Sequence, residues 1–300
     1  MDVKTFYKRL DHIQDIPTLS IIAIKVNKML EDYDTSTTKL CSIIEKDQAI
    51  ASKILTLVNS SFYGFRSKIS SISHAVIVMG FNTVRNAILS VAVIQALSGE
   101  EAFEGFDMRD FWRHSISVAV TSRHLAEMTR LEPADNCFVA GLIHDIGKVI
   151  LSQYFKELFG QVWTSVCEEG LSFYESEKRL LPVDHAQIGA YLAKKWQFPK
   201  ILVDAIDYHH TPKHDVSNPH LLFITHAADT IVNAYKTDLC NIPVFSYADE
   251  ALLTKTDEGI IKTDEGITKI MKPQLESMAE WFPTLAADIQ SACEFFLQEI

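Results

Sequence analysis

Apolar side chains recur at helical spacing along most of the chain. Residues 19–31 place leucine, isoleucine and valine side chains around one broad face, and residues 37–58 repeat apolar side chains at steps of three and four. Further helices are predicted over 72–79 and over 82–97, the second with Asn82 as its N-cap. No alternating run is bounded by a two-residue hairpin turn, so strands are not expected. The pattern predicts an all-α protein.

A polar stretch indicates where this helical chain divides. Residues 98–107 (SGEEAFEGFD) hold two glycines and four acids, which favours a boundary between two lobes of a helical bundle. The second lobe is expected to hold at least five helices, with breaks at 132–135, near Gly160, and at 180–184, 198–199 and 211–219. The expected domains are an N-terminal helical lobe over 1–105, a second helical bundle over 106–240, and a C-terminal loop with amphipathic helices over 241–300.

The C-terminal part carries a short internal repeat. The sequence KTDEGI occurs at 255–260 and again at 262–267, and two copies fit a polar loop or a short helical turn. The final region, 273–300, is amphipathic and is expected to be interrupted at Pro283. Because its polar face is acidic, packing onto the body of the protein is favoured over docking on a membrane.

Composition and charge narrow the class of protein. The chain is 47% hydrophobic and 22% charged, an ordinary globular balance, and its five scattered cysteines are expected to be reduced. No apolar stretch approaches the roughly 18 to 20 residues of a membrane span, and the amino terminus lacks the apolar core of a signal peptide. A net charge of −11 disfavours nucleic acid as a partner, apart from a local basic patch. We therefore expect a cytoplasmic protein with no membrane contact.

The segment GLIHDIGK, residues 141–148, is the sharpest local signal of chemistry. It places His144 and Asp145 inside an otherwise apolar helix. Burying an imidazole and a carboxylate is costly unless each finds a partner, and one divalent or trivalent metal ion would serve both. Alone, the pair is a weak signal, because a core histidine beside a capping or salt-bridged aspartate explains it as well.

Other predicted helices present further ligand-type side chains on or beside apolar faces: His114, His185, His209 with His210 beside it, and Asp229. Each alone is more simply a core histidine or a capped carboxylate. The ordered set His…His-Asp…His…His-His…Asp is much harder to reach by accident. We predict a mono- or binuclear metal site, for which imidazole and carboxylate ligands suit Fe, Mn, Zn or Co.

This ordered set resembles the HD superfamily of metal-dependent phosphohydrolases, and most closely the larger ligand set of its HD-GYP branch, which binds two or more metals. The resemblance implies a basic quartet and three additional ligands: His114, His144, Asp145 and Asp229 for the quartet, and His185, His209 and His210 for the additional ligands. It also implies that Lys148 contacts substrate phosphate. Lys148 and Asp145 are thus the candidate catalytic residues, for hydrolysis by a metal-activated water.

Two departures separate the chain from the HD-GYP branch. The GYP segment is absent, because TPKHDVSNP follows His210. No glutamate convincingly matches the extra bridging ligand of that branch, and Glu101, Glu104 and Asp110 are unplaced candidates. A cyclic-di-GMP hydrolase is therefore disfavoured.

The N-terminal half decides which family the chain resembles. Residues 43–64 (IIEKDQAIASKILTLVNSSFYG) are similar to the signature of the HDOD family: an aspartate, a leucine-rich helix with a lysine, and an asparagine-serine turn that ends in Tyr-Gly. Residues 73–80 (SHAVIVMG), with Arg85 after them, resemble the segment that follows. Gln48 departs from the family, which often has proline there. The resemblance covers about residues 12–235.

Several residues receive a plain structural interpretation. In NSSFYG, Asn59 and the serines are expected to cap a helix end while Gly64 takes a turn with positive φ. His226, one turn before Asp229, is weighed as a substitute ligand and set aside as a capping or solvent-facing residue. His124 is expected at the surface.

HDOD proteins are bacterial signalling output modules with uncertain or lost catalysis, and many lack the metal ligands that this chain retains. Two functions therefore stay open. In the first, the metal or a bound nucleotide stabilises one arrangement of the lobes, and a signalling protein partner reads it. In the second, the chain is a metal-dependent phosphohydrolase acting on a nucleotide or phosphoester. A third interpretation is a metal-free histidine core. The sequence leaves substrate, metal, partner and oligomeric state open.

Overall fold

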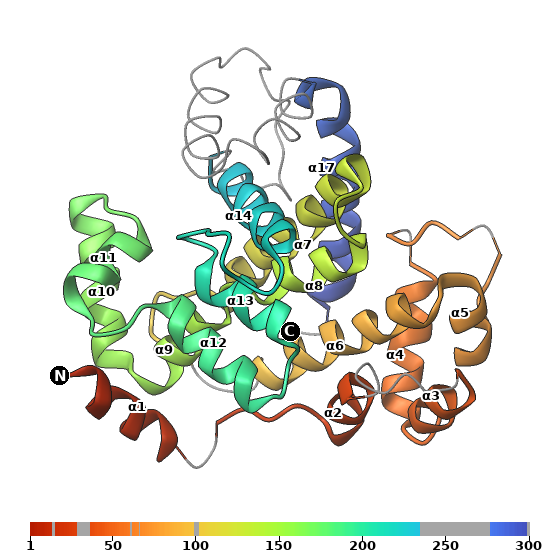
Figure 1. The fold of residues 1–300 in the computed structure, drawn as a ribbon, viewed down its shortest axis with the longest axis horizontal. Helices are drawn as coiled ribbons and strands as arrows, with labels where there is room; N and C mark the ends of the chain where they lie inside the picture. Colours follow the sequence, from red (N-terminus) through yellow and green to blue (C-terminus); the bar gives the residue numbers. More distant parts are fainter. Residues whose placement is uncertain are drawn as a thin grey trace.

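The computed structural model describes residues 1–13, 16–28, 37–60, 62–65, 67–98, 102–234 and 277–298, and every regular element in these ranges is an α-helix (Figure 1). The all-α prediction is confirmed. The first helices are α1 (Val3–Asp11), α2 (Ile21–Lys28), α3 (Thr37–Ile44), α4 (Gln48–Val58), α5 (Ile72–Met79) and α6 (Phe81–Leu97). They are followed by α7 (Met108–Thr129), α8 (Ala134–Ile143), α9 (Ile146–Tyr154), α10 (Lys156–Glu169), α11 (Phe173–Leu180), α12 (His185–Lys195), α13 (Lys200–Tyr208), α14 (Pro219–Ala234) and α17 (Met278–Phe296).

Helices α2 to α6 gather at one end of the molecule, and the long α6 leads from them to the other helices (Figure 1). The turn after α4 has the predicted structure. Asn59 ends the helix, and its side-chain amide bonds the backbone of Ile69 in both directions, at 2.8 Å each. Gly64 takes a φ of 64°, which a residue with a Cβ rarely adopts. Asn59 and Gly64 therefore have the structural roles that we expected, whereas Ser61 lies outside the described residues.

Helix α7 is the central element of the second half, where α8, α14 and α17 pack around it. Two helix contacts in this half, α8 with α7 and α9 with α12, are very close because a glycine lies at each of them. A Cβ on Gly141 of α8 would lie 2.8 Å from the Ala119 Cα of α7. A Cβ on Gly147 of α9 would lie 1.9 Å from the His185 carbonyl oxygen of α12. The glycines of GLIHDIGK thus allow the close helix packing that surrounds its His-Asp pair.

Two predicted helix breaks are wrong. Helix α10 runs through Gly160, since a glycine inside a helix costs only about 1 kcal/mol, and here the Phe103 ring fills the space beside it. Helix α17 runs through Pro283, although a proline inside a helix removes one backbone hydrogen bond and brings its ring against the carbonyl four residues earlier. His124, expected at the surface, is partly buried with its ring against Trp281 of α17.

Some expectations fall where the structure gives no test. The KTDEGI repeat at 255–260 and 262–267 lies outside the described residues, and the division into 1–105, 106–240 and 241–300 stays a prediction. Among the described helices, none has the length and apolar character that crossing a bilayer requires.

Candidate metal centre

His144 and Asp145 stand at the junction between two helices. We expected both inside one helix, but α8 ends at Ile143, His144 is its C-cap, and Asp145 is the N-cap of α9. Neighbouring positions within a helix point about 100° apart. At this junction both side chains are directed to one place, with His144 Nε2 3.3 Å from Asp145 Oδ2. Both are completely buried.

One cluster of ligand atoms joins α7, the α8–α9 junction and α14. It consists of His114, His144 and Asp229, whose nearest ligand atoms all lie within 4.8 Å of one another. The Oδ1 atom of Asp229 is 3.3 Å from His114 Nε2 and 3.6 Å from His144 Nε2. These three residues could therefore hold one metal ion.

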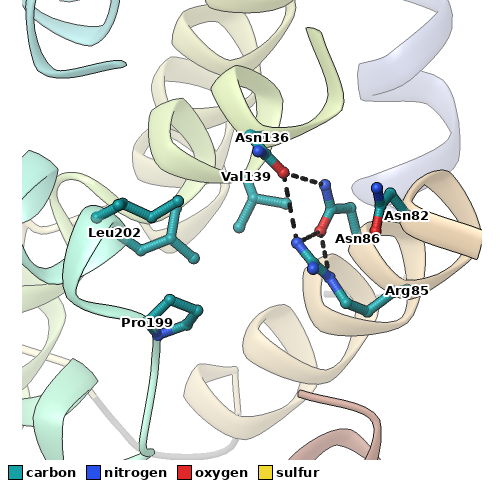
Figure 2. Close-up of a pocket in the computed structure, with 8 residues that line it drawn as sticks. Asn82, Arg85, Asn86, Asn136, Val139, Pro199 and Leu202 are labelled. Carbon is teal, nitrogen blue, oxygen red and sulfur yellow. Dashed lines mark hydrogen bonds between the residues drawn. The ribbon is translucent and has the colours of Figure 1, made fainter. Parts of the chain in front are cut away.

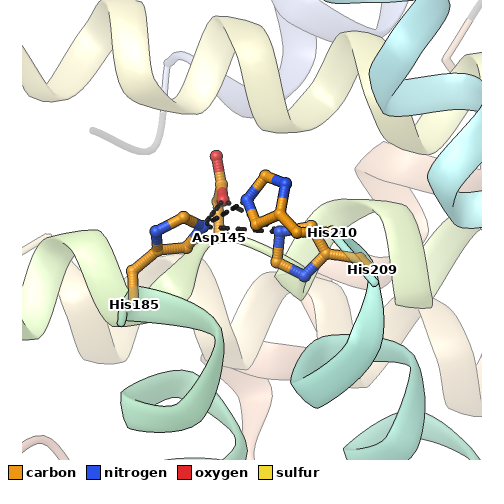
Figure 3. A group of neighbouring side chains, drawn as sticks. All are labelled: Asp145, His185, His209 and His210. Atoms are coloured by element: carbon orange, nitrogen blue, oxygen red, sulfur yellow. Dashed lines mark hydrogen bonds and ion pairs between the residues drawn. The ribbon is translucent and has the colours of Figure 1, made fainter. Parts of the chain in front are cut away.

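A second cluster lies directly beside the first and consists of Asp145, His185, His209 and His210 (Figure 3). His185 is the first residue of α12, and His209 and His210 follow the end of α13. The His185 Nε2 atom lies 3.0 Å from Asp145 Oδ1 and 2.9 Å from His210 Nε2. His209 Nε2 is 3.4 Å from the same nitrogen of His185. All seven predicted ligands are thus brought together in two adjoining groups.

Asp145 connects the two clusters through its two oxygens. Oδ2 faces the first cluster, 3.3 Å from His144 Nε2 and 3.6 Å from His114 Nε2. Oδ1 faces the second, 3.0 Å from His185 Nε2 and 3.6 Å from His209 Nε2. A carboxylate in this position can coordinate two ions at once, one through each oxygen.

The imidazoles of both clusters are held with Nε2 toward the shared centre. His144 Nδ1 lies 2.7 Å from the Gly141 carbonyl oxygen, and His209 Nδ1 lies 2.7 Å from that of Ile206. Because a carbonyl oxygen only accepts, each Nδ1 carries a proton, which leaves each Nε2 as the nitrogen that a metal ion would bind in place of a proton. Both histidines sit at helix C-caps, so the same bond satisfies a carbonyl of the last turn.

Glu177 orients His185, the third of these imidazoles. Its carboxylate accepts from His185 Nδ1 at 2.5 Å and from the His185 backbone N–H at 3.1 Å. Both side chains are fully buried. A carboxylate behind a ligating histidine fixes the ring and strengthens its donor nitrogen. We did not predict Glu177: it lies four residues after Phe173 on the inward face of α11, but nothing in that charged helix singles it out.

Burial and charge act against one another in the site. Burial opposes the charged imidazole of His144, but Asp145 and Asp229 outweigh it and raise the pKa to about 10. At His185, burial is likewise outweighed, chiefly by Glu177, and the pKa rises to about 9. Burial prevails at His209, where it lowers the pKa to about 4. The carboxylates therefore need positive charge beside them, supplied by protons or by a metal.

Two orphaned atoms test whether a metal fits. His144 Nε2 and Asp145 Oδ1 are buried and have no hydrogen-bond partner among the described residues. Their nearest polar neighbours are other ligand atoms of the clusters, so burying them costs free energy unless a cation or a proton lies between them. Together with lone pairs that converge from separate helices, these atoms fit a metal ion in each cluster.

Lys148 contacts Asp145, the carboxylate that lies between the two clusters. Its Nζ lies 2.5 Å from Asp145 Oδ2, one turn along α9, and the side chain keeps 19% of its surface exposed. The carboxylate proximity outweighs burial and raises the pKa of this ammonium. Lys148 is therefore a charged group at the margin of the site.

Other candidates do not enter the clusters. Asp110 pairs with Arg113 and is largely exposed, Glu104 is exposed, and Glu101 lies outside the described residues. His226 Nδ1 donates to the His209 carbonyl oxygen at 2.7 Å. Its role is therefore to support the chain at His209.

Comparison with known proteins identifies the family. The HDOD domain matches residues 16–212, about two thirds of the chain, and the protein belongs to the HDOD family. An uncharacterised Treponema pallidum protein is 26% identical over 206 residues, which are 68% of this chain and 39% of that protein. The chain therefore spans about two fifths of the length of this relative.

Two solved structures share the fold. A Shewanella amazonensis protein named a candidate phosphohydrolase superposes with a TM-score of 0.73 at 24% identity, covering 97% of this chain and 98% of that one. A Marinobacter aquaeolei protein named a candidate signal transduction protein gives a TM-score of 0.71 at 20% identity, covering 98% and 65%. At these identities the likeness establishes the fold alone.

Proposed function

We propose that this chain is a bacterial HDOD regulatory protein that holds a binuclear metal centre and signals through the helices attached to it. The observation that carries the proposal is Asp145, whose two oxygens face two separate groups of histidine nitrogens. The four described cysteines are free, which fits the cytoplasmic location that we propose.

Each ion has its own ligands in this proposal. His114, His144 and Asp229 would hold one ion, His185, His209 and His210 would hold the other, and Asp145 would be a ligand available to both. Imidazole and carboxylate ligands suit Fe, Mn or Zn. Bound ions would supply Lewis-acid polarisation of a phosphoryl oxygen and a lowered pKa for water.

The regulatory role follows from where the ligands come from. They belong to α7, the α8–α9 junction, α12, the residues directly after α13, and α14, so occupancy of the centre would restrain five parts of the helical body at once. A ligand bound at the centre changes the relative stability of helix arrangements only by binding one of them more tightly. We propose that a nucleotide or phosphoester binds one helix arrangement more tightly than the other. A signalling protein partner would then recognise the favoured arrangement.

A second function, metal-dependent phosphohydrolysis, is favoured by Lys148. Its ammonium is held against Asp145 Oδ2 and remains partly exposed, so it can donate to a phosphate oxygen beside the metal ligands. A lysine at this position would orient the substrate and balance its negative charge, while the histidines and carboxylates would serve as metal ligands.

Metal content tests the centre directly. Elemental analysis of the purified full-length chain should find about two transition-metal ions per chain, because each cluster offers a set of ligands. Asp145→Asn should lose both ions, His114→Ala chiefly one and His209→Ala chiefly the other. His220→Ala is the matched control, since this exposed histidine of α14 lies outside both clusters. Metal-free wild type, or Asp145→Asn with full metal content, would refute the proposal.

Turnover then separates the two functions. Wild type reloaded with Mn or Fe releases phosphate from a member of a nucleotide and phosphoester panel only if the chain is a phosphohydrolase, and His144→Ala should abolish that release. Metal binding without release supports the regulatory function.

A further inference from the structure

A cavity of about 320 Å³ lies between α6, α8 and the start of α13 (Figure 2). Its lining residues do not include any member of the two ligand clusters. Its lining includes Asn82, Arg85 and Asn86 of α6, Asn136 and Val139 of α8, and Leu202 of α13. Asn82 is exposed, so the lining extends to the surface. A volume of this size suits a small ligand.

Arg85 is a buried cation in this lining with no acidic partner. Only 6% of the residue is exposed. Its guanidinium donates to Asn86 Oδ1 at 2.8 and 2.5 Å and weakly to Asn136 Oδ1 at 3.4 Å. These acceptors are neutral amides, and Arg85 forms no ion pair with a carboxylate in the described parts of the chain. Figure 2 shows the Arg85 guanidinium beside the Asn86 and Asn136 side chains, as part of the cavity lining.

An uncompensated buried charge is costly, and burial lowers the pKa of Arg85 to about 10. The guanidinium is still charged at neutral pH. The nearest acidic influence is Asp135 of α8, whose Oδ2 already accepts from Thr83 Oγ1 at 2.5 Å. The protein therefore keeps a cation in a small cavity without giving it a counter-ion of its own.

A guanidinium presents paired N–H donors that match the oxygens of a carboxylate or phosphate. The first turns of α8 and α13 also border the cavity, and helix N-termini favour negative charge, although Asp135 offsets part of this at α8. The amides of Asn82 and Asn136 supply further polar contacts. We propose that this cavity is a second binding site, for a small ligand that carries an oxyanion on Arg85.

This site is independent of the metal centre. Asn136 and Leu202 lie near the starts of α8 and α13, whereas His144 and His209 directly follow the ends of the same helices. The proposal therefore stands whether or not the clusters bind metal, and its test must exclude phosphate bound beside Lys148.

Calorimetric titration of the full chain at constant ionic strength tests the site, with inorganic phosphate and acetate as probes. Wild type should bind at least one of them saturably. Arg85→Met should weaken that binding at least tenfold, because the bidentate donor is lost. Tighter binding of phosphate identifies a phosphorylated ligand, and tighter binding of acetate identifies a carboxylate.

Asn136→Asp keeps the test decisive if Arg85→Met fails to fold. The new carboxylate would pair with Arg85 and repel an incoming anion, so binding should also fall at least tenfold while the melting temperature stays the same or rises. Lys148→Met is the matched control: it removes a cation at the metal centre and should leave binding in the cavity unchanged. Absence of saturable binding by wild type, or undiminished binding in both cavity variants, would overturn the proposal.

Discussion

The Nδ1 atoms of three clustered histidines face acceptors that differ in charge. His144 and His209 donate to carbonyl oxygens, whereas His185 donates to the buried carboxylate of Glu177. A carboxylate partner increases the electron density on the far nitrogen more than a carbonyl does, so His185 Nε2 should be the strongest of the three donors. Its position, 3.0 Å from Asp145 Oδ1, places that donor beside the connecting carboxylate.

Glu177→Gln tests this orienting role. Glutamine keeps the size of the side chain and one oxygen acceptor but removes the charge, so the fold should persist while metal affinity falls about 10- to 100-fold. Titration of metal into chelator-treated protein measures the change. The control is Glu168→Gln, which removes the same charge from an exposed position on α10. Equal metal affinity in the two variants would show that the Glu177 charge does not support the centre.

The sequence identified the clustered residues better than the residues that hold them. Histidines and aspartates on apolar faces are rare enough to attract attention, and all seven predicted ligands do converge. Glu177 was not predicted, and His226 was considered only as a substitute ligand or a capping residue, because a buried glutamate and a supporting histidine look like ordinary polar residues of amphipathic helices. Their roles depend on which helix packs against them, and periodicity does not contain that information.

At the scale of elements, α9 and α12 pack so closely that only glycine fits between them. A Cβ on Gly147 would meet backbone atoms of α12, at 1.9 Å from the His185 carbonyl oxygen and 2.7 Å from the Gly189 nitrogen. Backbone cannot move aside as a side chain can. This contact therefore sets the distance between Asp145, at the start of α9, and His185, at the start of α12.

Gly147→Ala should force the two helices apart. We expect a loss of about 3 kcal/mol in the free energy of unfolding, the upper part of the range for overpacking, together with weaker metal binding. Chemical denaturation of the chelator-treated protein measures the first effect. Gly160→Ala is the control, because its Cβ meets only Phe103 ring atoms at 3.1 and 3.3 Å and alanine favours the helix. A loss below 1 kcal/mol for Gly147→Ala would contradict the packing argument.

The apolar pattern predicted most of the helices correctly, but it predicted the positions of their ends less well. Periodicity continues across a short break when both flanks are apolar, so the pattern predicts one continuous helix where the structure has the α8–α9 junction at His144. The reverse error arose at Gly160 and Pro283, where a residue that disfavours helices is accommodated by its surroundings. The apolar pattern did not predict helix α1, although Phe6 on this helix stacks on Phe155 with ring centroids 4.5 Å apart.

At the scale of the whole molecule, the two clusters connect parts of the chain that are far apart in sequence. Their ligands run from His114 to Asp229 and come from α7, the α8–α9 junction, α12, α13 and α14. Such long-range convergence could be hypothesised from the order of the ligands, but the sequence could not indicate that Asp145 stands between the two groups.

Because these ligands are assembled only in the folded chain, bound metal should stabilise the fold through its preference for the native state. Metal at 100 to 1,000 times its dissociation constant adds about 2.7 to 4.1 kcal/mol. For a chain of this size, 1 kcal/mol corresponds to roughly 2–4 °C, so chelation should lower the melting temperature by about 5–15 °C. Differential scanning calorimetry before and after chelation measures the shift, and readdition of Mn or Fe should reverse it.

Asp145→Asn should already have a low melting temperature and respond little to the chelator, because its centre has lost the shared carboxylate. His220→Ala should respond as fully as wild type, and an unchanged melting temperature in chelated wild type would mean that protons on His144 and His185, not metal, balance the buried carboxylates.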